Sequence, residues 1–318
     1  MKNKNNEKGM ALLLVLIVVT LLTSILMELS YSTLIEQRLT ETFRDNTRAY
    51  FLARGGITAG QRLLLSDNNE YDSPPEIWSG GISNYPVGEG FVSLEIKDLD
   101  GKLAINSLVI GNNPQTVAVD RFYRLLVALE IADPAELTAA LIDWLDSGDD
   151  PFTLIQTDDL ELPVIGAEDL YYQSLAMPYA CKNGPLESLE ELLIVKGFTK
   201  EIFQMISPYL SATDSKQINI NTAEGEVLRS LSSKVGEQTV ELILASRQEA
   251  PIRNISSLKD LLADDQFSLL KTLANQRLLG TTSDYYKITS EAIINDGRCS
   301  LETLFDKKTN NLSDIRKI

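Results

Sequence analysis

The hydrophobic pattern of the chain starts with one long uncharged run. Residues 10–27 are mostly Leu, Val and Ile without a charged side chain, and the nine residues before them are polar and include three lysines. At about 1.5 Å per residue, a helix of this run is roughly 27 Å long, close to the ~30 Å hydrocarbon core of a bilayer. Because a basic flank tends to stay in the cytoplasm, we expect the chain beyond the run to lie across the membrane.

The composition of this N-terminal segment leaves three interpretations open. A secretory signal peptide would have a shorter apolar stretch ending at a small-residue cleavage site, and the sequence after residue 27 shows none. A plain membrane anchor fits the length of the run. A prepilin leader also fits. Residues 1–9 would then be removed by a cut between Gly9 and Met10 on the cytoplasmic side, and the apolar helix would stay on the mature protein.

The helical pattern continues beyond the apolar run. From Tyr31 to about Leu65 there is no proline, and apolar residues recur at spacings that suit one face of a helix. The pattern therefore predicts a single long helix over residues 10–65, apolar all round in its first half and amphipathic in its second half. Gly55 and Gly56 weaken helix locally and predict a bend there.

The rest of the chain alternates between strand-like and helical patterns. Residues 91–96 and 102–108 are rich in β-forming types and flank the turn Asp98–Gly101, which predicts a hairpin. Helical periodicity dominates from about residue 114 to 210 and again after the strand-like segment 217–223. Residues 285–294 and 299–305 form a second predicted hairpin around an Asn-Asp-Gly turn. This order predicts an α+β fold with a helical insertion.

The charge, the absence of histidine and the low cysteine content limit the functions that this chain can have. The chain has 29 Lys and Arg against 45 Asp and Glu, a formal net charge of −16, so phosphate backbones are repelled. It has no histidine, which excludes Ser-His-Asp and Cys-His catalysis, histidine zinc sites and the commonest general base. Cys181 and Cys299 are too few for a Cys-only zinc site; they either form a disulfide with each other or stay free. We therefore expect no enzymatic activity.

Residues 227–262 have the layout of a helix-hairpin-helix unit. Such units bind DNA phosphates through a glycine hairpin and nearby basic residues. Here the hairpin contains Lys234 beside Gly236 and Glu237, in a strongly acidic chain. The packing pattern is kept without the phosphate chemistry, so we expect no nucleic-acid binding.

A cluster of carboxylates follows the helical pattern around residue 141. Asp143 and Asp146 share one helix face, and Asp149, Asp150, Asp158, Asp159, Glu168 and Asp169 come after them. So many carboxylates lie close together only when they are solvated or neutralised by a cation. Three interpretations stay open: a solvated acidic loop, one or two bound Ca²⁺ ions, or a glycosidase-like pair, for which nothing suggests a sugar cleft.

Several motifs in this order resemble one family, the K-type minor pseudopilins of the type II secretion system (general secretion pathway protein K). The Asp-Trp and Asn-Thr-Ala motifs are the most specific of them, and together the motifs extend from residue 8 to about residue 305. The matching segments are Lys8–Leu16, Asp98–Lys102 with Ile105–Asn106, Leu141–Ser147, Gly166–Tyr172, Ile218–Ala223 and Tyr285–Ile288.

The resemblance implies a type IV pilin-like plan, with a long N-terminal helix, a small antiparallel sheet and a large inserted α-helical region of two helix-hairpin-helix or SAM-like units. It divides the chain into a prepilin leader (1–9), a membrane-inserted helix (10–65), pilin-like strands (66–112), a first helical domain (113–215), a second helical unit with the Ile-Asn-Ile-Asn strand (216–280), C-terminal pilin-like strands (281–306) and a tail (307–318).

The resemblance also implies a function. The chain is expected to be a non-catalytic subunit at the tip of the secretion pseudopilus, starting its assembly and supporting export of folded proteins across the outer membrane. Its expected partners are the I- and J-type minor pseudopilins, the prepilin peptidase and the inner-membrane platform of the secretion system. It would span the bacterial inner membrane once, with its globular part in the periplasm. The alternative is a membrane-anchored periplasmic helix-hairpin-helix protein of the DNA-uptake type.

Two site expectations depend on the resemblance. Most pilins and pseudopilins carry a Glu at the fifth residue after the cut, where it pairs with the amino terminus of a neighbour; K-type members lack it, and here the residue is Leu14. A subunit at the tip has no neighbour above it whose amino terminus must be neutralised. The absence of this Glu therefore does not weaken its assembly. Resemblance to calcium-binding members of the family favours the interpretation that a structural Ca²⁺ ion is bound here. The expected ligands are Asp143, Asp146, Asp149, Asp150, Glu168 and Asp169.

Overall fold

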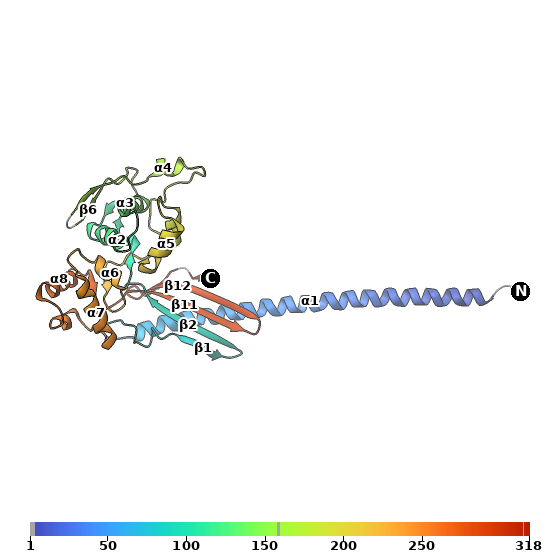
Figure 1. The fold of residues 1–318 in the computed structure, drawn as a ribbon. Helices are drawn as coiled ribbons and strands as arrows, with labels where there is room; N and C mark the ends of the chain where they lie inside the picture. The colour runs from blue at the N-terminus through green and yellow to red at the C-terminus, as the bar shows by residue number, and fades with distance from the viewer. Residues whose placement is uncertain (1–3, 158–159, 314) are drawn as a thin grey trace.

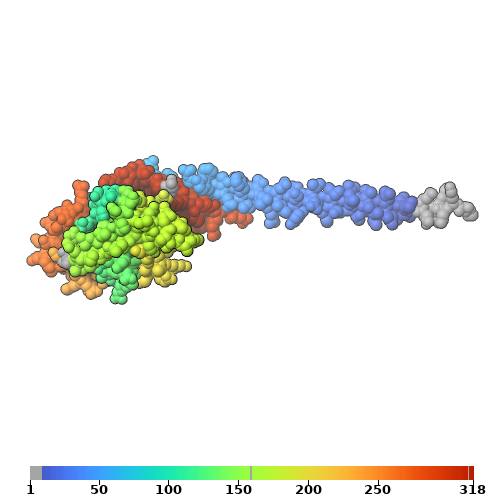
Figure 2. Space-filling model, turned by 90° about the horizontal axis from the view of Figure 1, so that it is seen from above, coloured from blue at the N-terminus to red at the C-terminus, as the bar shows by residue number. Residues whose placement is uncertain are grey.

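The first element of the computed structural model is the long helix that the apolar run predicts. Helix α1 spans Lys4–Ser66 and extends far beyond the rest of the molecule (Figure 1). Its side chains are exposed from residue 9 to residue 44, and the first buried one is Asp45. Figure 2 shows the same division, with the N-terminal part of α1 standing clear of the globular body.

The structure describes residues 4–157, 160–313 and 315–318. Residues 1–3 of the expected leader, and Asp158 and Asp159 of the acidic run, lie outside the described residues.

The second half of α1 packs on an antiparallel sheet. The strands follow the order β1 (Ile82–Val87), β2 (Gly90–Asp98), β11 (Tyr285–Ile294), β12 (Gly297–Asp306) and β13 (Asn311–Leu312), and β14 (Arg316–Lys317) also pairs with β12. Along β11 and β12 buried positions alternate with half-buried or exposed ones, so one face of their hairpin meets α1. The resulting core joins Ala53 and Ile57 of α1 to Ile288, Leu301 and Phe305. The predicted hairpin over 285–305 is confirmed.

Gly55 and Gly56 do not interrupt α1, and Gly56 has a packing role. A Cβ atom at Gly56 would collide with Ser290 Oγ and lie 3.0 Å from Val92 Cγ2, whereas a Cβ at Gly55 would meet nothing within 4 Å. Glycine at residue 56 therefore leaves room for the close contact of α1 with the sheet.

This contrast yields a matched prediction. Gly56→Ala should lower the free energy of unfolding of the body by about 1–3 kcal/mol, because the added methyl overpacks the helix–sheet contact. Gly55→Ala should raise it by up to about 1 kcal/mol, because alanine favours helix over glycine. Thermal denaturation followed through the fluorescence of buried Trp78 measures both. Equal effects of the two substitutions would contradict the packing argument.

The chain between β2 and β11 forms the inserted helical region, and it lies at the end of the body opposite the bare half of α1 (Figure 1). The residues of this insertion share one hydrophobic core. Its helices are α2 (Thr116–Ala128), α3 (Pro134–Leu145), α4 (Asp169–Gln173), α5 (Lys200–Ile206), α6 (Gly225–Ser230), α7 (Glu237–Glu249) and α8 (Asp264–Asn275).

Short ladders and 3₁₀ turns connect these helices. The ladders pair β3 (Leu103–Ala104) with β8 (Leu210–Ser211), β4 (Val109–Ile110) with β5 (Asn113–Pro114), β6 (Leu154–Gln156) with β7 (Glu161–Pro163), and β9 (Ile218–Asn219) with β10 (Leu279–Gly280). The 3₁₀ turns are Ile105–Ser107, Leu189–Ile194, Ser207–Tyr209 and Ile255–Leu258. The α+β class with a long N-terminal helix is confirmed, whereas the assignment of the two helical parts as helix-hairpin-helix or SAM-like units stays a prediction.

The hairpin predicted around Asp98–Gly101 is wrong, although the turn itself forms. The Asp98 carboxylate accepts the backbone N–H groups of Asp100 at 2.9 Å and of Gly101 at 3.1 Å. After the turn, the chain does not return along β2. Instead Leu103 pairs in parallel with Leu210, a partner more than one hundred residues away. The turn is where the chain leaves the sheet and enters the inserted region.

The two cysteines lie in different cores. Cys181 belongs to the core of the inserted region, and Cys299 belongs to the core between α1 and the sheet. Both are buried and, among the described residues, both are free. The structure therefore does not form the disulfide that the sequence left open.

Candidate metal centre and membrane helix

The exposed part of α1 has the properties of a membrane-spanning segment. Within Gly9–Ser66, an 18-residue window has a mean hydropathy of 2.9, and none of that window is buried in the body. Leu14 is 63% exposed, in line with its neighbours on the helix. A bare helix of this length and composition fits a single-pass membrane anchor. Gly9 has open space around it, so a side chain there would disturb nothing in the fold.

Three carboxylates meet inside the first half of the inserted region. Asp143 lies in the last turn of α3, Asp146 directly follows that helix, and Glu168 precedes α4. One oxygen of each lies within 4.8 Å of the others. Their exposed fractions are only 0%, 7% and 4%, so this is a buried acidic cluster and not a solvated loop.

The hydrogen bonds leave part of this cluster unsatisfied. Asp143 Oδ1 accepts the N–H of Phe152 at 2.7 Å, and Asp146 Oδ1 accepts the N–H of Gly148 at 2.7 Å. Asp143 Oδ2 and both carboxylate oxygens of Glu168 are buried and have no hydrogen-bond partner among the described residues. A buried carboxylate oxygen without a partner is costly, and a bound cation would remove that cost.

The electrostatics agree with a cluster that nearby Lys196 compensates only in part. Burial, and to a smaller extent the charges of Asp143 and Asp146, raises the pKa of Glu168 to about 7. Burial also raises the pKa of Asp143 to about 6 and the pKa of Asp146 above its usual value. The amino group of nearby Lys196 donates to the carbonyl of Gly166 at 3.3 Å and lies over the ring of Tyr171. Buried oxygens of like charge form a donor set that suits a hard divalent cation.

The structure brings together three of the six residues proposed as metal ligands. Asp149, Asp150 and Asp169 are exposed and lie outside the cluster. The Asp169 carboxylate instead accepts the backbone N–H of Cys181 at 2.6 Å. Among the described residues of the acidic run, the interpretation as a solvated loop therefore fits the exposed Asp149 and Asp150.

Gly166 is a residue of the site that sequence reasoning did not single out. A Cβ atom there would collide with Asp143 Oδ2 and lie 3.0 Å from the carbonyl oxygen of Ala139. Glycine thus lets the loop before Glu168 close against α3, which brings Glu168 to the aspartates. The only sequence signal was its place in the segment Gly166–Tyr172.

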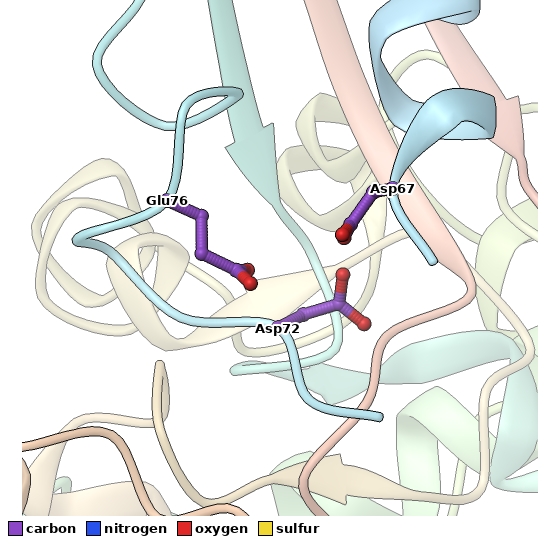
Figure 3. Close-up of side chains that lie close together, drawn as sticks. All are labelled: Asp67, Asp72 and Glu76. Carbon is purple, nitrogen blue, oxygen red and sulfur yellow. The ribbon is translucent and has the colours of Figure 1, made fainter. Parts of the chain in front are cut away.

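A second acidic cluster was not expected from the sequence. Asp67, Asp72 and Glu76 follow the end of α1, and their carboxylates face one another (Figure 3). Here a lysine supplies the positive charge. The amino group of Lys307 lies 3.2 Å from Asp72 Oδ1 and 3.7 Å from Asp67 Oδ2. Glu76 Oε2 accepts the backbone N–H of Ser73 at 2.9 Å and the indole N–H of Trp78 at 2.8 Å. This cluster ties the loop after α1 to the end of β12.

The hairpin before α7 is fastened to α8 by hydrogen bonds of the Gln266 side chain. The backbone N–H of Gly236, which a phosphate would need, donates to Gln266 Oε1 at 3.3 Å. The same oxygen accepts the Thr239 hydroxyl at 3.0 Å, and Gln266 Nε2 donates to the carbonyl of Lys234 at 3.0 Å. The amide of Gly236 is therefore engaged within the fold, which does not favour the DNA-uptake alternative.

Comparison with known protein families matches both halves of the inserted region. Residues 101–215 match a family model described as the type II secretion system, protein K, and residues 218–282 match a second model with the same description. Together the two matches cover more than half of the chain.

Individual proteins of this description match over nearly the whole chain. The type II secretion system protein K of Aeromonas hydrophila is 26% identical, over 100% of this chain and 98% of that protein. The Klebsiella pneumoniae protein of the same name is 24% identical, over 98% of this chain and 96% of that protein. Among solved structures, the GspK-GspI-GspJ complex of the type 2 secretion system from enterotoxigenic Escherichia coli contains a chain of the same fold, with a TM-score of 0.69 and 19% identity over 88% of this chain and 99% of that chain.

Proposed function

Because the chain belongs to the family of type II secretion system protein K, the K-type minor pseudopilins, we propose that it caps the tip of the secretion pseudopilus. In this role it starts pseudopilus assembly with the I- and J-type minor pseudopilins and supports export of folded proteins, as a structural subunit without catalysis. The solved complex supports this choice of partners, because its title joins GspK to GspI and GspJ.

The observation that carries the tip assignment is the position of the inserted region. Subunits of a filament built from N-terminal helices stack with one body above the next, so each body must leave its upper end free for a neighbour. Here the inserted region lies at the end of the body that points away from the bare half of α1 (Figure 1). A mass of this size at that end leaves no place for a further subunit above, which suits a cap.

The membrane topology follows from the charge flanks. The basic residues before α1's apolar stretch favour a cytoplasmic N-terminus, which directs the body to the periplasm of a bacterial inner membrane. In this proposal the prepilin peptidase removes residues 1–9, and the processed subunit then meets the inner-membrane platform.

The buried cluster of Asp143, Asp146 and Glu168 supports structural calcium. The unpartnered oxygens of Asp143 and Glu168 would coordinate a Ca²⁺ ion. Water or other oxygens would complete its coordination shell. The three ligands come from both ends of residues 143–168, so the ion would fasten that whole loop to α3. Its role in the proposal is to hold the shape of the cap.

The position of Leu14 gives a test of the tip assignment by substitution. Leu14→Glu should still be processed but should cost about 2.5–3.5 kcal/mol on insertion, because it places an unpaired carboxylate in the bilayer. We expect weaker assembly at the tip and entry of some copies into the filament body. The matched control is Leu13→Glu, which has the same insertion cost at a neighbouring position and should not allow entry into the body. Copies per filament, counted by quantitative mass spectrometry, distinguish the two; wild-type counts for Leu14→Glu would contradict the prediction.

Labelling the chain in purified pseudopili tests the proposed function itself. Gold particles directed at an epitope in the inserted region should mark one end of each filament, and a strain without the chain should export less substrate and form fewer filaments. Labels distributed along the filament would show a body subunit instead of a cap.

A further inference from the structure

A cavity at the start of α2 is lined by an arginine, Arg121, that forms no ion pair with the described residues. The cavity has a volume of about 250 Å³ and lies where the first half of the inserted region meets the second, between residues 103–121, 215–218 and 278. Arg121 is only 3% exposed and lines this cavity. It belongs to neither the membrane helix nor the acidic cluster.

The guanidinium of Arg121 is only partly satisfied. Nη1 donates to two backbone carbonyls, of Leu278 at 3.3 Å and of Lys216 at 3.4 Å. Nε and Nη2 are buried and have no hydrogen-bond partner in the part of the chain that the structure describes. The carboxylate of neighbouring Asp120 pairs with Arg124 at 2.9 Å, and its charge offsets part of the effect of burial on Arg121 without forming an ion pair with it. Burial lowers the pKa of Arg121 to about 10, so the group still carries its charge at neutral pH. A buried charge of this kind requires a counter-ion.

The same cavity receives the N-terminus of α2. Thr116, Val117 and Ala118, the first three residues of this 13-residue helix, all line it. The preceding residue, Gln115, does not cap them, because its side-chain amide donates to the carbonyl of Asn113 at 2.9 Å. Among the described residues, no side chain accepts a hydrogen bond from these first amides. Free amides and the helix dipole favour a negative group at this place.

The walls limit what kind of anion fits. Leu103, Leu108, Ile218 and Leu278 make most of the lining apolar, and Lys216 is exposed at the rim. A phosphate or sulfate would leave this apolar surface without a contact and would bring a second charge to a single arginine. A carboxylate attached to a short apolar group suits both the arginine and the apolar walls. The carboxylate matches the planar guanidinium, and the apolar group covers the aliphatic side chains.

We propose that this cavity is a binding site for a small amphipathic monocarboxylate, with the carboxylate held by Arg121 and the first amides of α2. The apolar part of the ligand would lie against Leu108 and Ile218. Because the lining residues come from both halves of the inserted region, the ligand would join them and stabilise the body. This site is independent of the pseudopilus role, so either can fail alone.

The test uses the whole chain in lipid nanodiscs and 3-phenylpropionate as the probe, with the uncharged 3-phenylpropionamide as its matched control. Ligand-observed NMR should show saturable binding of the acid and binding of the amide weaker by about tenfold or more, the scale of a charge-assisted hydrogen bond. Arg121→Gln should weaken binding of the acid by a similar factor, and Arg298→Gln, at an exposed residue of β12 that does not line the cavity, should leave its affinity unchanged.

A second variant keeps the test decisive if Arg121→Gln does not fold. Val117→Trp fills the cavity from its rim, where Val117 is 46% exposed, and should abolish binding while Arg121 remains in place. The proposal is overturned if the acid shows no saturable binding, if the amide binds as well as the acid, or if the acid binds Val117→Trp with wild-type affinity.

Discussion

Chelating calcium should lower the melting temperature of the wild-type body by several degrees, and substitution of Glu168 in the buried cluster should remove most of that change. An ion that binds only the folded state at a hundredfold excess over its Kd stabilises it by about 2.7 kcal/mol. The wild-type protein should therefore melt higher in calcium than in EDTA. Glu168→Gln should lose most of that difference, because it removes one of the three charged ligands.

The same substitution has an opposite effect without metal. In EDTA, wild-type protein must keep three buried carboxylates close together, two of them with unpartnered oxygens. Glu168→Gln removes one buried charge, so in EDTA it should melt higher than wild type, although in calcium it should melt lower. Asp150→Asn, at an exposed residue outside the cluster, is the control and should behave as wild type in both conditions. Magnesium should substitute poorly, because it demands a more rigid octahedral shell. Identical melting of the wild type in calcium and in EDTA would remove calcium from the account.

Processing of the N-terminus should produce the second large effect. We expect membrane-extracted protein to begin at Met10, so that removal of nine of the 318 residues leaves 309. Gly9→Leu should abolish the cut and keep the subunit out of the filament. It should leave the fold intact, because a side chain at residue 9 meets nothing within 4 Å. Gly55→Ala, also in open space on α1, should be processed normally. Intact mass and terminal sequencing decide the matter; a mature start at Met1 or beyond Ser30 would contradict it.

The sequence predicted those parts of the fold that depend on local pattern. The apolar run and the proline-free stretch after it predicted a helix to about Leu65, and α1 ends at Ser66. The Asn-Asp-Gly turn between two alternating segments predicted the β11–β12 hairpin, because such turns join neighbouring strands. The turn at Asp98 was equally clear, but the strand after it pairs with Leu210, and a local pattern does not reveal a partner so distant.

The metal site shows the same limit in chemical terms. The helical spacing put Asp143 and Asp146 on one face, and the structure keeps them together. Asp149 and Asp150 have the same residue type a few positions later, yet they are exposed. What separates the clustered carboxylates from those on the surface is burial, which depends on Gly166 allowing the returning loop to reach α3. Arg121 was missed for a related reason, since a charged residue within a helical pattern is expected on the surface.

Co-purification tests the central claim, that this chain assembles as a minor pseudopilin, most directly. The whole chain would be expressed with the I- and J-type minor pseudopilins of the same secretion system, extracted in detergent and recovered through a tag on the J-type subunit. The account predicts that all three proteins elute as one complex in equal amounts. Elution of the I- and J-type subunits together, with this chain absent from their complex, would contradict it.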